Sequence, residues 1–420
     1  MKVIVVGGGI SGLTLAMSLH QVGIEVRVYE AAREVTPLGV GINVQPNAVR
    51  ELTELGLGER LAQIGIATEA LAFFNKFGQP VWREQRGRAA GFAWPQYSIH
   101  RGRLQVMLAE AARERIGDAL CTGHVFQKFT ERGDKIVATF ADRTGATIAE
   151  DEADILVGAD GIHSAVRRQF YPGEGEPNFA GQILWRAAVE TAPFLGGATM
   201  IIAGHFHQRI VAYPMAPAAD GKLLTNWIAQ MTVDTKAPPR EDWNRKVGKE
   251  RFIDAFRDWR FDWLDFPKLV EETAEIFEFP LVDRHPVERW SFGRVTLIGD
   301  AAHPMQPTGS QAGSQAIVDA RLLTASLLAE RDPVAALAAY DRTRRPVMND
   351  ITLRNRNFGP EAAMQLAEER APSGFKNIED VIPRAELEQI SRSFQEAAGL
   401  DPAGLNARPA LVPAGARFPS

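Results

Sequence analysis

The sequence predicts an α/β protein in which a parallel-sheet domain is interrupted by an antiparallel sheet and followed by C-terminal helices. Three observations predict this fold class. The first thirty residues alternate strand, helix and strand; the middle of the chain carries successive strands; and a buried-strand pattern returns near residue 294, before helices rich in alanine and leucine. With 420 residues, 45% of them hydrophobic, the chain is long enough for two domains with separate cores.

The N-terminal segment has the pattern of a right-handed βαβ unit. Residues 3–6 are a short β-branched run typical of a strand buried on both faces, and residues 11–22 carry apolar side chains at helical spacing. Gly23 is expected to end this helix before a second strand over residues 24–29. The uncharged run 3–19 resembles the core of a signal peptide, but its three glycines and its length, below about 20 residues, argue against that interpretation.

The rest of the chain divides into further expected elements. Before residue 172 we expect a helix over 103–115, a hairpin formed by 135–140 and 147–150, and a buried strand over 154–157. Beyond it, strands are expected over 183–190, 198–203, 209–213 and 223–233, and helices over 243–259 and 268–277. A strand at 294–298 then precedes helices over 315–330, 333–345 and 384–398, and 401–420 is expected to be a loose tail.

These elements predict four segments. Residues 1–172 and 286–375 would form the first domain and its return, 173–285 an inserted antiparallel domain, and 376–420 a C-terminal helix and tail.

Composition excludes several classes of partner. Lys and Arg number 47 against 52 Asp and Glu, a net charge of −5, which argues against binding to nucleic acid or to a membrane surface. A single cysteine, Cys121, excludes an intrachain disulfide and a cysteine-based metal site, and no metal is expected. A cytoplasmic location is therefore expected, and a homodimer remains open.

The strongest functional signal is a glycine-rich turn, GGGISG at residues 7–12, between the first strand and the first helix. Gly7 permits the tight turn, Gly9 lets a pyrophosphate approach the backbone, and Gly12 allows helix and strand to pack closely. Glu30, which ends the second strand, is placed to accept hydrogen bonds from an adenosine ribose. The pattern predicts a dinucleotide site without separating FAD from NAD, and a glycine-rich turn in an unrelated α/β protein is the alternative.

Two more segments follow expected buried strands. GADG occupies residues 158–161 and GDAAHP occupies 299–304. The carboxyl ends of strands in an open α/β sheet line the ligand crevice, so both segments are expected near the glycine-rich turn. Either one alone would be consistent with an ordinary Asp-Gly or Gly-Asp turn.

Together, GGGISG, GADGIHSAVR at 158–167 and GDAAHPMQP at 299–307 resemble the group A flavoprotein monooxygenases, the single-component FAD-dependent aromatic hydroxylases. GVGINVQPNA at 39–48 agrees as well, and the likeness runs to about residue 346. Within the family the pattern is nearest to the phenazine hydroxylase type and to hydroxybenzoate and salicylate hydroxylases. The resemblance implies a Rossmann-like (GR2-type) FAD-binding domain with an inserted antiparallel β-sheet substrate domain and C-terminal helices.

The resemblance also assigns contacts with the cofactor. Ser11 and Glu30 would hold the ADP half of FAD, Val40 would lie beside the cofactor through its backbone, Arg101 would neutralise the pyrophosphate, and Asp300 would bind the ribityl chain.

Other residues are assigned to the surroundings of the flavin. Asp160 would organise the loop between FAD and the approach path of NADH or NADPH, and Arg167 would assist there or make an exposed salt bridge. His303 occupies a position that the family uses for structure. Gly309 and Gly313 precede the helix expected from residue 315, whose N-terminus would face the flavin; a flexible helix entry is the alternative.

The activity implied is an FAD-dependent monooxygenase that uses NAD(P)H and O₂ to hydroxylate an aromatic or nitrogen heteroaromatic molecule through a flavin C4a-hydroperoxide. The expected substrate-pocket residues are Tyr213, Gln306, Pro307 and Thr308, with no catalytic acid or base assigned. In hydroxybenzoate hydroxylases a histidine precedes the equivalent Tyr-Pro pair, whereas this chain has Ala212 there, so a substrate that carries its own electron-donating group is expected.

Two other classes of function stay open. An FAD-dependent dehydrogenase or oxidase would reduce the cofactor with its substrate, and the GADG segment argues against it. A non-enzymatic binding protein on the same fold would need neither the glycine-rich turn nor Asp300. There is no second GxGxxG, so NAD(P)H is expected to bind transiently.

Overall fold

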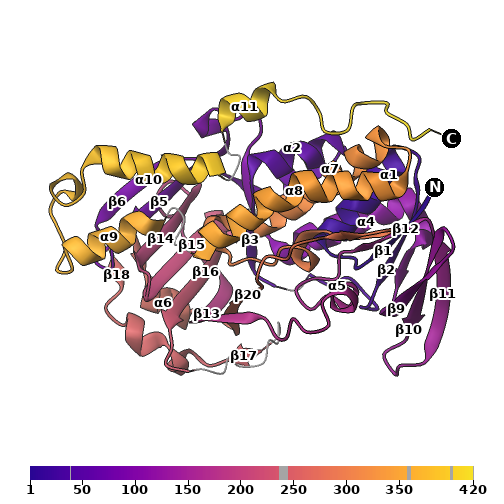
Figure 1. Cartoon of the computed structure of the whole chain (residues 1–420). Coiled ribbons are helices and arrows are strands. Elements are labelled where there is room, and N and C mark those ends of the chain that lie inside the picture. The colour runs from indigo at the N-terminus through magenta and orange to yellow at the C-terminus, as the bar shows by residue number, and fades with distance from the viewer. Residues whose placement is uncertain (38, 236–244, 357–360, 398–400, 420) are drawn as a thin grey trace.

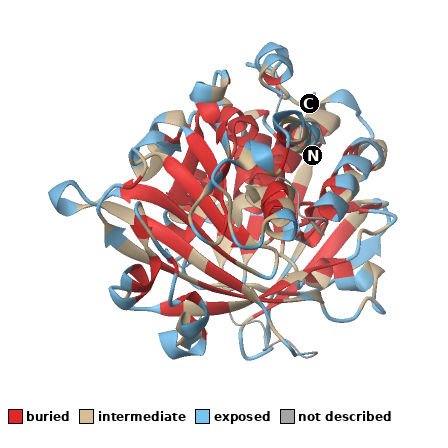
Figure 2. Ribbon diagram, turned by 90° about the vertical axis from the view of Figure 1, so that its left-hand side faces the viewer, coloured by how far each residue is buried: buried red, intermediate tan, exposed pale blue. Residues whose placement is uncertain are grey.

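The structure, a computed structural model, describes residues 1–420 except 38, 236–244, 357–360, 398–400 and 420. Its two largest sheets have six and eight strands, and helices lie along their outer faces (Figure 1). Burial follows the same arrangement, with the strands mostly buried inside the molecule and the exposed residues concentrated on peripheral helices and loops (Figure 2). The α/β fold class predicted from the sequence is confirmed.

The six-stranded sheet has the order β21-β22-β12-β1-β2-β8. Its strands are β1 (Lys2–Val6), β2 (Glu25–Glu30), β8 (Leu120–Thr122), β12 (Ile155–Gly158), β21 (Ser291–Phe292) and β22 (Val295–Leu297). All neighbouring pairs are parallel except β21 with β22. Val3, Ile4 and Val5 are fully buried because β1 is central in this sheet. Strand β22 returns to the N-terminal sheet, as its apolar sequence predicts.

Helices and a small sheet cover the six-stranded sheet. The helices are α1 (Ile10–Gln21), α4 (Arg101–Ile116), α7 (Ala312–Ala329) and α8 (Pro333–Arg356), and α1 packs against α4 and α7. The small sheet consists of β9 (Val125–Arg132), β10 (Lys135–Ala141) and β11 (Thr147–Ala153), including the predicted hairpin. Gly23 adopts φ +81° directly after α1, a conformation that favours glycine and ends the helix.

A third layer connects this domain to the rest. It contains the sheet β3-β7-β4, with β3 (Gly41–Val44), β4 (Gly65–Thr68) and β7 (Gln96–His100), and the helices α2 (Pro46–Glu54) and α3 (Gly58–Ile64). Strand β3 contacts α7, while β4 and β7 contact the long strand β15 of the other large sheet. The layer therefore brings residues near 41 between the two main sheets.

The eight-stranded sheet has the order β17-β20-β13-β16-β15-β14-β5-β6. Its strands are β5 (Ala70–Phe74), β6 (Pro80–Gln85), β13 (Asn178–Thr191), β14 (Thr199–His205), β15 (Gln208–Pro217), β16 (Leu223–Thr232), β17 (Lys246–Val247) and β20 (Ile276–Asp283). The pairing is antiparallel except between β14 and β5. Strands β5 and β6 come from the segment 1–172, so the first domain also contributes to this sheet; the division into four segments stays a prediction.

The two faces of the eight-stranded sheet pack against different layers because side chains alternate along a strand. Ile210 and Ala212 of β15 belong to an aromatic-rich core that includes Trp227. Val211 and Tyr213 face the other way, into a core completed by helices α9 (Ala362–Arg370) and α10 (Arg384–Ala397), which lie beside β5, β6 and β14 (Figure 1). The second face also carries the cavity described below.

Two helices expected in the inserted segment are wrong. Within 243–259, the described part contains β17 and two 3₁₀ turns, Lys249–Arg251 and Ile253–Phe256, because Phe252 between the turns has a non-helical φ of −143°. Within 268–277, α6 (Phe266–Glu271) is short, and the chain turns into β20 from Ile276, which pairs with β13. Phe252, Phe256 and Trp259 are instead gathered in one core from these irregular turns.

The C-terminal elements also differ from expectation. Helix α8 continues to Arg356 despite Pro346, eleven residues beyond the predicted end (356 − 345 = 11). Residues 401–420 are not a loose tail in their described part: α11 (Pro402–Ala407) begins a strap that runs past the helices α2 and α1 (Figure 1). Leu405 and Val412 are buried, and the Phe418 N–H donates to the Val22 carbonyl at 2.8 Å.

The strap completes a buried charge cluster. Arg50 donates to the carbonyls of Leu405 (2.9 Å) and Arg408 (2.7 Å), and Arg408 donates to a Glu51 carboxylate oxygen at 2.8 Å. Glu51 is fully buried, and that burial raises its pKa. Removing the strap would therefore expose these buried groups to solvent, or leave them buried without partners.

Deleting residues 401–420 is expected to lower the free energy of unfolding by about 3 kcal/mol, because buried Arg50 and Glu51 lose partners. Urea unfolding monitored by circular dichroism measures this loss. The control is Arg417→Ala, whose side chain donates only to the exposed Gln21 carbonyl and should change stability by less than about 0.5 kcal/mol. A truncated chain as stable as the full one would contradict the role of the strap.

No helix in the described ranges is long and apolar enough to cross a lipid bilayer.

Candidate cofactor and substrate site

The three sequence motifs converge at one edge of the six-stranded sheet. GGGISG follows β1, GADG follows β12 and GDAAHP follows β22, and these three strands are successive parallel neighbours. A Cβ atom placed on Gly7 would lie 2.4 Å from the Ala159 carbonyl oxygen, and one on Gly299 would lie 2.8 Å from the Ser11 hydroxyl. The backbone segments are thus in direct contact, as the crevice rule for parallel sheets predicts.

The glycines of the first motif have different surroundings. Gly7 adopts φ +108°, and a Cβ on Gly12 would lie 2.0 Å from the Gly7 carbonyl oxygen, so both positions require glycine for the turn to form. Gly9, the residue before α1, has an ordinary φ of −79° and no atom within 4 Å of its Cβ position. Only at Gly9 does the turn leave open space in front of the helix N-terminus, which is where a pyrophosphate would fit.

Glu30 holds the glycine-rich turn in place. One carboxylate oxygen accepts a hydrogen bond from the Gly8 N–H at 2.6 Å, and the other accepts one from the Ala32 N–H at 2.7 Å. Each oxygen can accept a further hydrogen bond, so these contacts are compatible with a ribose ligand. The ribose contact itself stays a prediction.

The Asp300 side chain is exposed to solvent, although protein atoms crowd around its carboxylate. Burial raises the pKa of Asp300, whereas His303 and Arg101 nearby oppose this shift. Its neighbour Gly299 adopts φ +57°, which turns the chain sharply after β22 and directs Asp300 outward. A carboxylate held in this way is suited to bind the hydroxyl groups of a ribityl chain.

A buried carboxylate fixes that turn. One oxygen of Asp319, on α7, accepts hydrogen bonds from the Gly299 N–H (2.9 Å) and from His303 Nε2 (2.5 Å), and the other accepts one from Arg344 Nε (2.6 Å). Although burial opposes ionisation, His303 and Arg344 lower the pKa of Asp319 to about 2. Asp319 thus connects α7 and α8 to the turn that presents Asp300, and His303 has a structural contact.

Val40 and Arg101 lie together at the mouth of the site. The backbone N–H of Arg101 donates to the Val40 carbonyl at 2.7 Å, and Arg101 begins helix α4 with an exposed side chain. The guanidinium also lies close enough to Asp300 to affect its pKa. An exposed cation between these segments fits the negative charge of a pyrophosphate.

The GADG segment is organised by Asp160. Its carboxylate accepts hydrogen bonds from the Ser164 hydroxyl (2.5 Å) and from the N–H groups of Ala165 (2.7 Å) and Val166 (3.2 Å), at the start of α5 (Ala165–Phe170). Burial raises the pKa of Asp160, although these donors favour the carboxylate. The contacts support a loop-organising role, and proximity to NAD(P)H stays a prediction.

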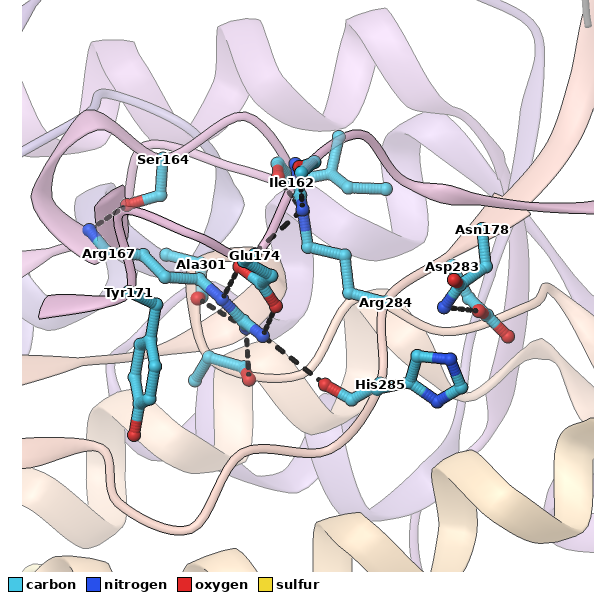
Figure 3. Close-up of polar contacts among 12 residues, drawn as sticks. Ile162, Ser164, Arg167, Tyr171, Glu174, Asn178, Asp283, Arg284, His285 and Ala301 are labelled. Carbon is cyan, nitrogen blue, oxygen red and sulfur yellow. Dashed lines mark hydrogen bonds and ion pairs between the residues drawn. The ribbon is translucent and has the colours of Figure 1, made fainter.

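Arg167 ties the GADG segment to the GDAAHP segment. It is 2% exposed, so the expected alternative of an exposed salt bridge is wrong. Its guanidinium donates to the carbonyls of Ala301 (3.1 Å) and Ala302 (2.9 Å) and forms an ion pair with Glu174 (Figure 3). Arg167 therefore fixes one motif relative to the other.

The helix after the third motif starts earlier than expected. Helix α7 begins at Ala312, so Gly313 and Ser314 lie in its first turn rather than before it. A Cβ on Gly313 would lie 2.7 Å from Ile42 Cδ1, and the Ser314 hydroxyl accepts a hydrogen bond from the Gln45 N–H at 2.9 Å. Gly309 adopts φ +67° in the turn before the helix. These contacts place the helix N-terminus against β3, and a flexible entry over 309–313 stays the alternative.

Next to these motifs lies a cavity with about 1140 Å³ of space not occupied by protein atoms, its open mouth included. One wall is the second face of the eight-stranded sheet, and the opposite side is formed by β3 and the segment 307–313. The apolar wall consists of Leu71, Leu184, Met200, Ile202, Val211 and Ile228. The polar and charged lining comprises Asn43, Gln45, Arg86, Gln96, Arg101, Arg186, Arg209, Tyr213, Gln230, Thr308, Ser310 and Glu361.

Three of the four predicted substrate residues line this cavity. Tyr213, Pro307 and Thr308 do so, but Gln306 does not: its amide donates to Asp283 at 3.2 Å, outside the lining. Burial raises the pKa of Tyr213 to about 12, so its phenol stays protonated at neutral pH. Ala212 points to the opposite core, as β-strand alternation requires.

Several lining residues escaped the sequence analysis. Arg186, Arg209 and Glu361 come from different elements, and no local motif marks them. A partial signal exists at Arg209, since positions 209, 211 and 213 share one face of a strand. Asn226 accepts a hydrogen bond from the Gly41 N–H at 2.8 Å, and so joins the sheet to β3.

The geometry can be compared with known proteins. The family model described as "FAD binding domain" matches residues 1–355. The chain belongs to this FAD-binding family. It is 44% identical over 363 residues to the phenazine 1,6-dicarboxylic acid hydroxylase PhzS of Lysobacter antibioticus, covering 84% of this chain and 89% of the relative. It is 34% identical over 398 residues to the 3-amino-4-hydroxybenzoate 2-monooxygenase PtnB3 of Streptomyces platensis, covering 90% and 94%.

Solved structures agree at the level of the fold. The structure of Klebsiella pneumoniae HpxO complexed with FAD and uric acid has a TM-score of 0.73 and 24% identity, with 96% of this chain and 98% of that chain covered. The expected group of flavoprotein aromatic hydroxylases is therefore confirmed: the chain is an FAD-dependent monooxygenase. The space at Gly9 and the outward carboxylate of Asp300 fit the cofactor of this family.

Proposed function

We propose that the chain hydroxylates a carboxylated, fused nitrogen heteroaromatic ring, with FAD as bound cofactor and NADH or NADPH and O₂ as co-substrates. The observation that carries the proposal is the cavity, whose apolar wall is flanked by arginines and adjoins the three converging motifs. The phenazine dicarboxylate in the name of the 44% identical relative has the same chemistry. Flat rings fit an apolar wall of this kind, and arginine is the residue best suited to bind a carboxylate.

Cofactor binding is proposed for the predicted set. The pyrophosphate and ADP half would lie against Gly7, Gly9, Ser11 and Gly12, and the ribose against Glu30. The pyrophosphate and ribityl region would contact Val40, Arg101 and Asp300, and the ring would contact Gly309 and Gly313. Asp160 would shape the approach of NAD(P)H. Bound FAD would supply the redox chemistry that activates O₂. The N–H groups near residues 309–313, at the α7 N-terminus, would stabilise negative charge on the ring.

The chain's own side chains would bind and orient the ring and exclude water. The wall formed by Ile202, Val211 and Ile228 removes water from one ring face. Tyr213 stays neutral and offers a hydrogen-bond donor, and Ala212 supplies no base. Electron donation must then come from the substrate, as a nitrogen heteroaromatic ring with an electron-donating nitrogen provides.

The test measures NADH and NADPH oxidation by the FAD-loaded protein against a panel of hydroxybenzoates and of phenazine and quinoline acids with and without an amino group, together with oxygen uptake and product mass. Oxidation stimulated by the fused heteroaromatic acids, with one oxygen atom gained per molecule, is expected. Substrate oxidation without oxygen gain would favour the dehydrogenase or oxidase alternative. A preference for hydroxybenzoates would contradict the proposed ring class.

The homodimer and the cytoplasmic location considered from the sequence stay predictions.

A further inference from the structure

The four arginines of the cavity differ in how their charge is compensated. Arg86 donates to Glu84 at 2.6 Å, and both side chains are buried. Arg209 lies 3.8 Å from Glu361 and donates to Gln230 at 3.1 Å. Arg101 is exposed at the mouth, where it is assigned to the pyrophosphate. Arg186 is the fourth, and its surroundings are different.

Arg186 is a cation enclosed by protein without a carboxylate beside it. One amino group donates to the Gly41 carbonyl at 2.8 Å, whereas Nε is buried and has no hydrogen-bond partner in the described part of the chain. The charged and titratable groups that act on it are Tyr213 and Arg101, and neither supplies a negative charge at neutral pH. Burying a cation without an anion is costly, so the arrangement suits an anionic ligand.

The strand register places Arg186 at one side of the apolar wall. Arg186 pairs with Ile228 across β13 and β16, and Ile228 pairs with Val211 across β16 and β15. Arg209 lies on β15, two strands from β13. It pairs with Gln230, which in turn pairs with Leu184, so Arg209 is displaced from Arg186 by two residues along the strands. Strand spacing and rise put the two arginine Cα atoms about 12 Å apart, with Ile228 and Val211 between them. A flat ring system that lies on this wall can present one edge to each arginine.

The two ends offer different chemistry to that ring. At the Arg209 end, Glu361 is fully enclosed, one of its carboxylate oxygens has no hydrogen-bond donor in the described ranges, and burial raises its pKa. The pair is formally neutral, so a ligand carboxylate placed there would meet the charge of Glu361 as well as that of Arg209. At the Arg186 end no such opposing carboxylate is present in the part of the chain that the structure describes.

We propose that Arg186 binds the carboxylate of the aromatic acid substrate and that Glu361 disfavours a second carboxylate at the opposite end, so that the site selects a monocarboxylate. This inference rests on the proposed function. It distinguishes the chain from the 44% identical relative, whose name specifies a dicarboxylic acid. Arg186 and Glu361 are thus assigned as the residues that select the substrate by the number of its carboxylates.

The experiment titrates the FAD-loaded protein with phenazine, phenazine-1-carboxylate and phenazine-1,6-dicarboxylate, and follows binding by the change in flavin absorbance. For the wild type we expect the monocarboxylate to bind at least about 10-fold tighter than either other compound. Arg186→Gln should weaken monocarboxylate binding by about 30-fold and leave phenazine within about 3-fold, with partial recovery in Arg186→Lys. Glu361→Gln should tighten dicarboxylate binding by about 10-fold and leave the monocarboxylate within about 3-fold.

Matched controls separate these effects from folding. Arg257→Gln removes an exposed arginine that pairs with Asp254 and does not line the cavity, and should leave all three affinities unchanged. FAD content and thermal unfolding of each variant report whether the fold and cofactor site are intact. Equal weakening of phenazine and its carboxylates by Arg186→Gln would overturn the assignment of Arg186, and a dicarboxylate bound as tightly as the monocarboxylate by the wild type would overturn that of Glu361. If none of the three rings perturbs the flavin, the proposed ring class fails as well.

Discussion

A Gly9→Ala variant should fold normally and fail to hold FAD. The Cβ position has no neighbour within 4 Å and the backbone φ is −79°, so the added methyl group should destabilise the FAD-free protein by no more than the cost of alanine at a helix N-cap, about 1 kcal/mol. In the FAD complex the same methyl group would occupy the approach of the pyrophosphate to the N–H groups of α1. We expect the FAD dissociation constant to rise by about 100-fold, the equivalent of two charge-assisted hydrogen bonds weakened.

Fluorescence quenching of FAD measures that constant, and thermal unfolding without FAD measures the fold. Gly12→Ala is the informative comparison, because its Cβ would lie 2.0 Å from a backbone oxygen and should destabilise the protein even without FAD. Wild-type FAD affinity in Gly9→Ala would show that the pyrophosphate does not lie at this turn.

The second large effect is expected for Asp319→Asn. The variant leaves Arg344 and His303 without their shared carboxylate inside the core and weakens the hydrogen bond to Gly299 that fixes the turn before Asp300. Loss of a buried ionic partner typically costs about 3–5 kcal/mol of unfolding free energy. FAD affinity should fall by at least about 10-fold as well, because the ribityl-facing carboxylate loses its support.

The control for Asp319→Asn is Asp341→Asn. Asp341 is also buried and accepts hydrogen bonds from the Trp290 and Ser291 N–H groups, but it does not touch the Gly299 turn. Its variant should lose stability without a matching loss of FAD affinity. Parallel losses in both variants would indicate that Asp319 acts on the fold alone.

The pKa of Asp319 gives the pH dependence of this contribution. Its folded pKa of about 2 lies below the ordinary value of 3.8, so the ionised form is favoured by folding. The resulting stability, about 2 kcal/mol, is fully present above pH 4 and is lost as the pH falls from 4 to 2. Acid unfolding of Asp319→Asn should lack this component, and an unchanged acid transition would contradict it.

The parts of the fold predicted correctly are those with strong local signals. Residues 3–6 are apolar and β-branched and form the central strand β1, and Gly23 ends α1 because its positive φ suits glycine. The helix expected over 243–259 failed because aromatic side chains at spacings of three and four bury equally well from irregular turns. The strap at 401–420 was missed because its polar, proline-rich sequence binds through backbone carbonyls, which leave no trace in side-chain pattern.

The candidate site divides in the same way. The cofactor side is built from contiguous motifs at strand ends, so sequence alone brought Gly7, Asp160 and Asp300 to one edge. The substrate side is assembled from single residues on separate strands, and Arg186 and Glu361 become neighbours of one cavity only through tertiary packing. Gln306 was included because it lies in a motif, but its side chain turns toward Asp283.

The most direct test of the account is a crystal structure of the protein with FAD bound. It should show the pyrophosphate over Gly9, the ribityl hydroxyls within hydrogen-bond distance of the Asp300 carboxylate, and the ring system between β3 and the segment 309–313. FAD bound at another place, or Asp300 turned away from the ribityl chain, would contradict the claim that the three motifs form one cofactor site.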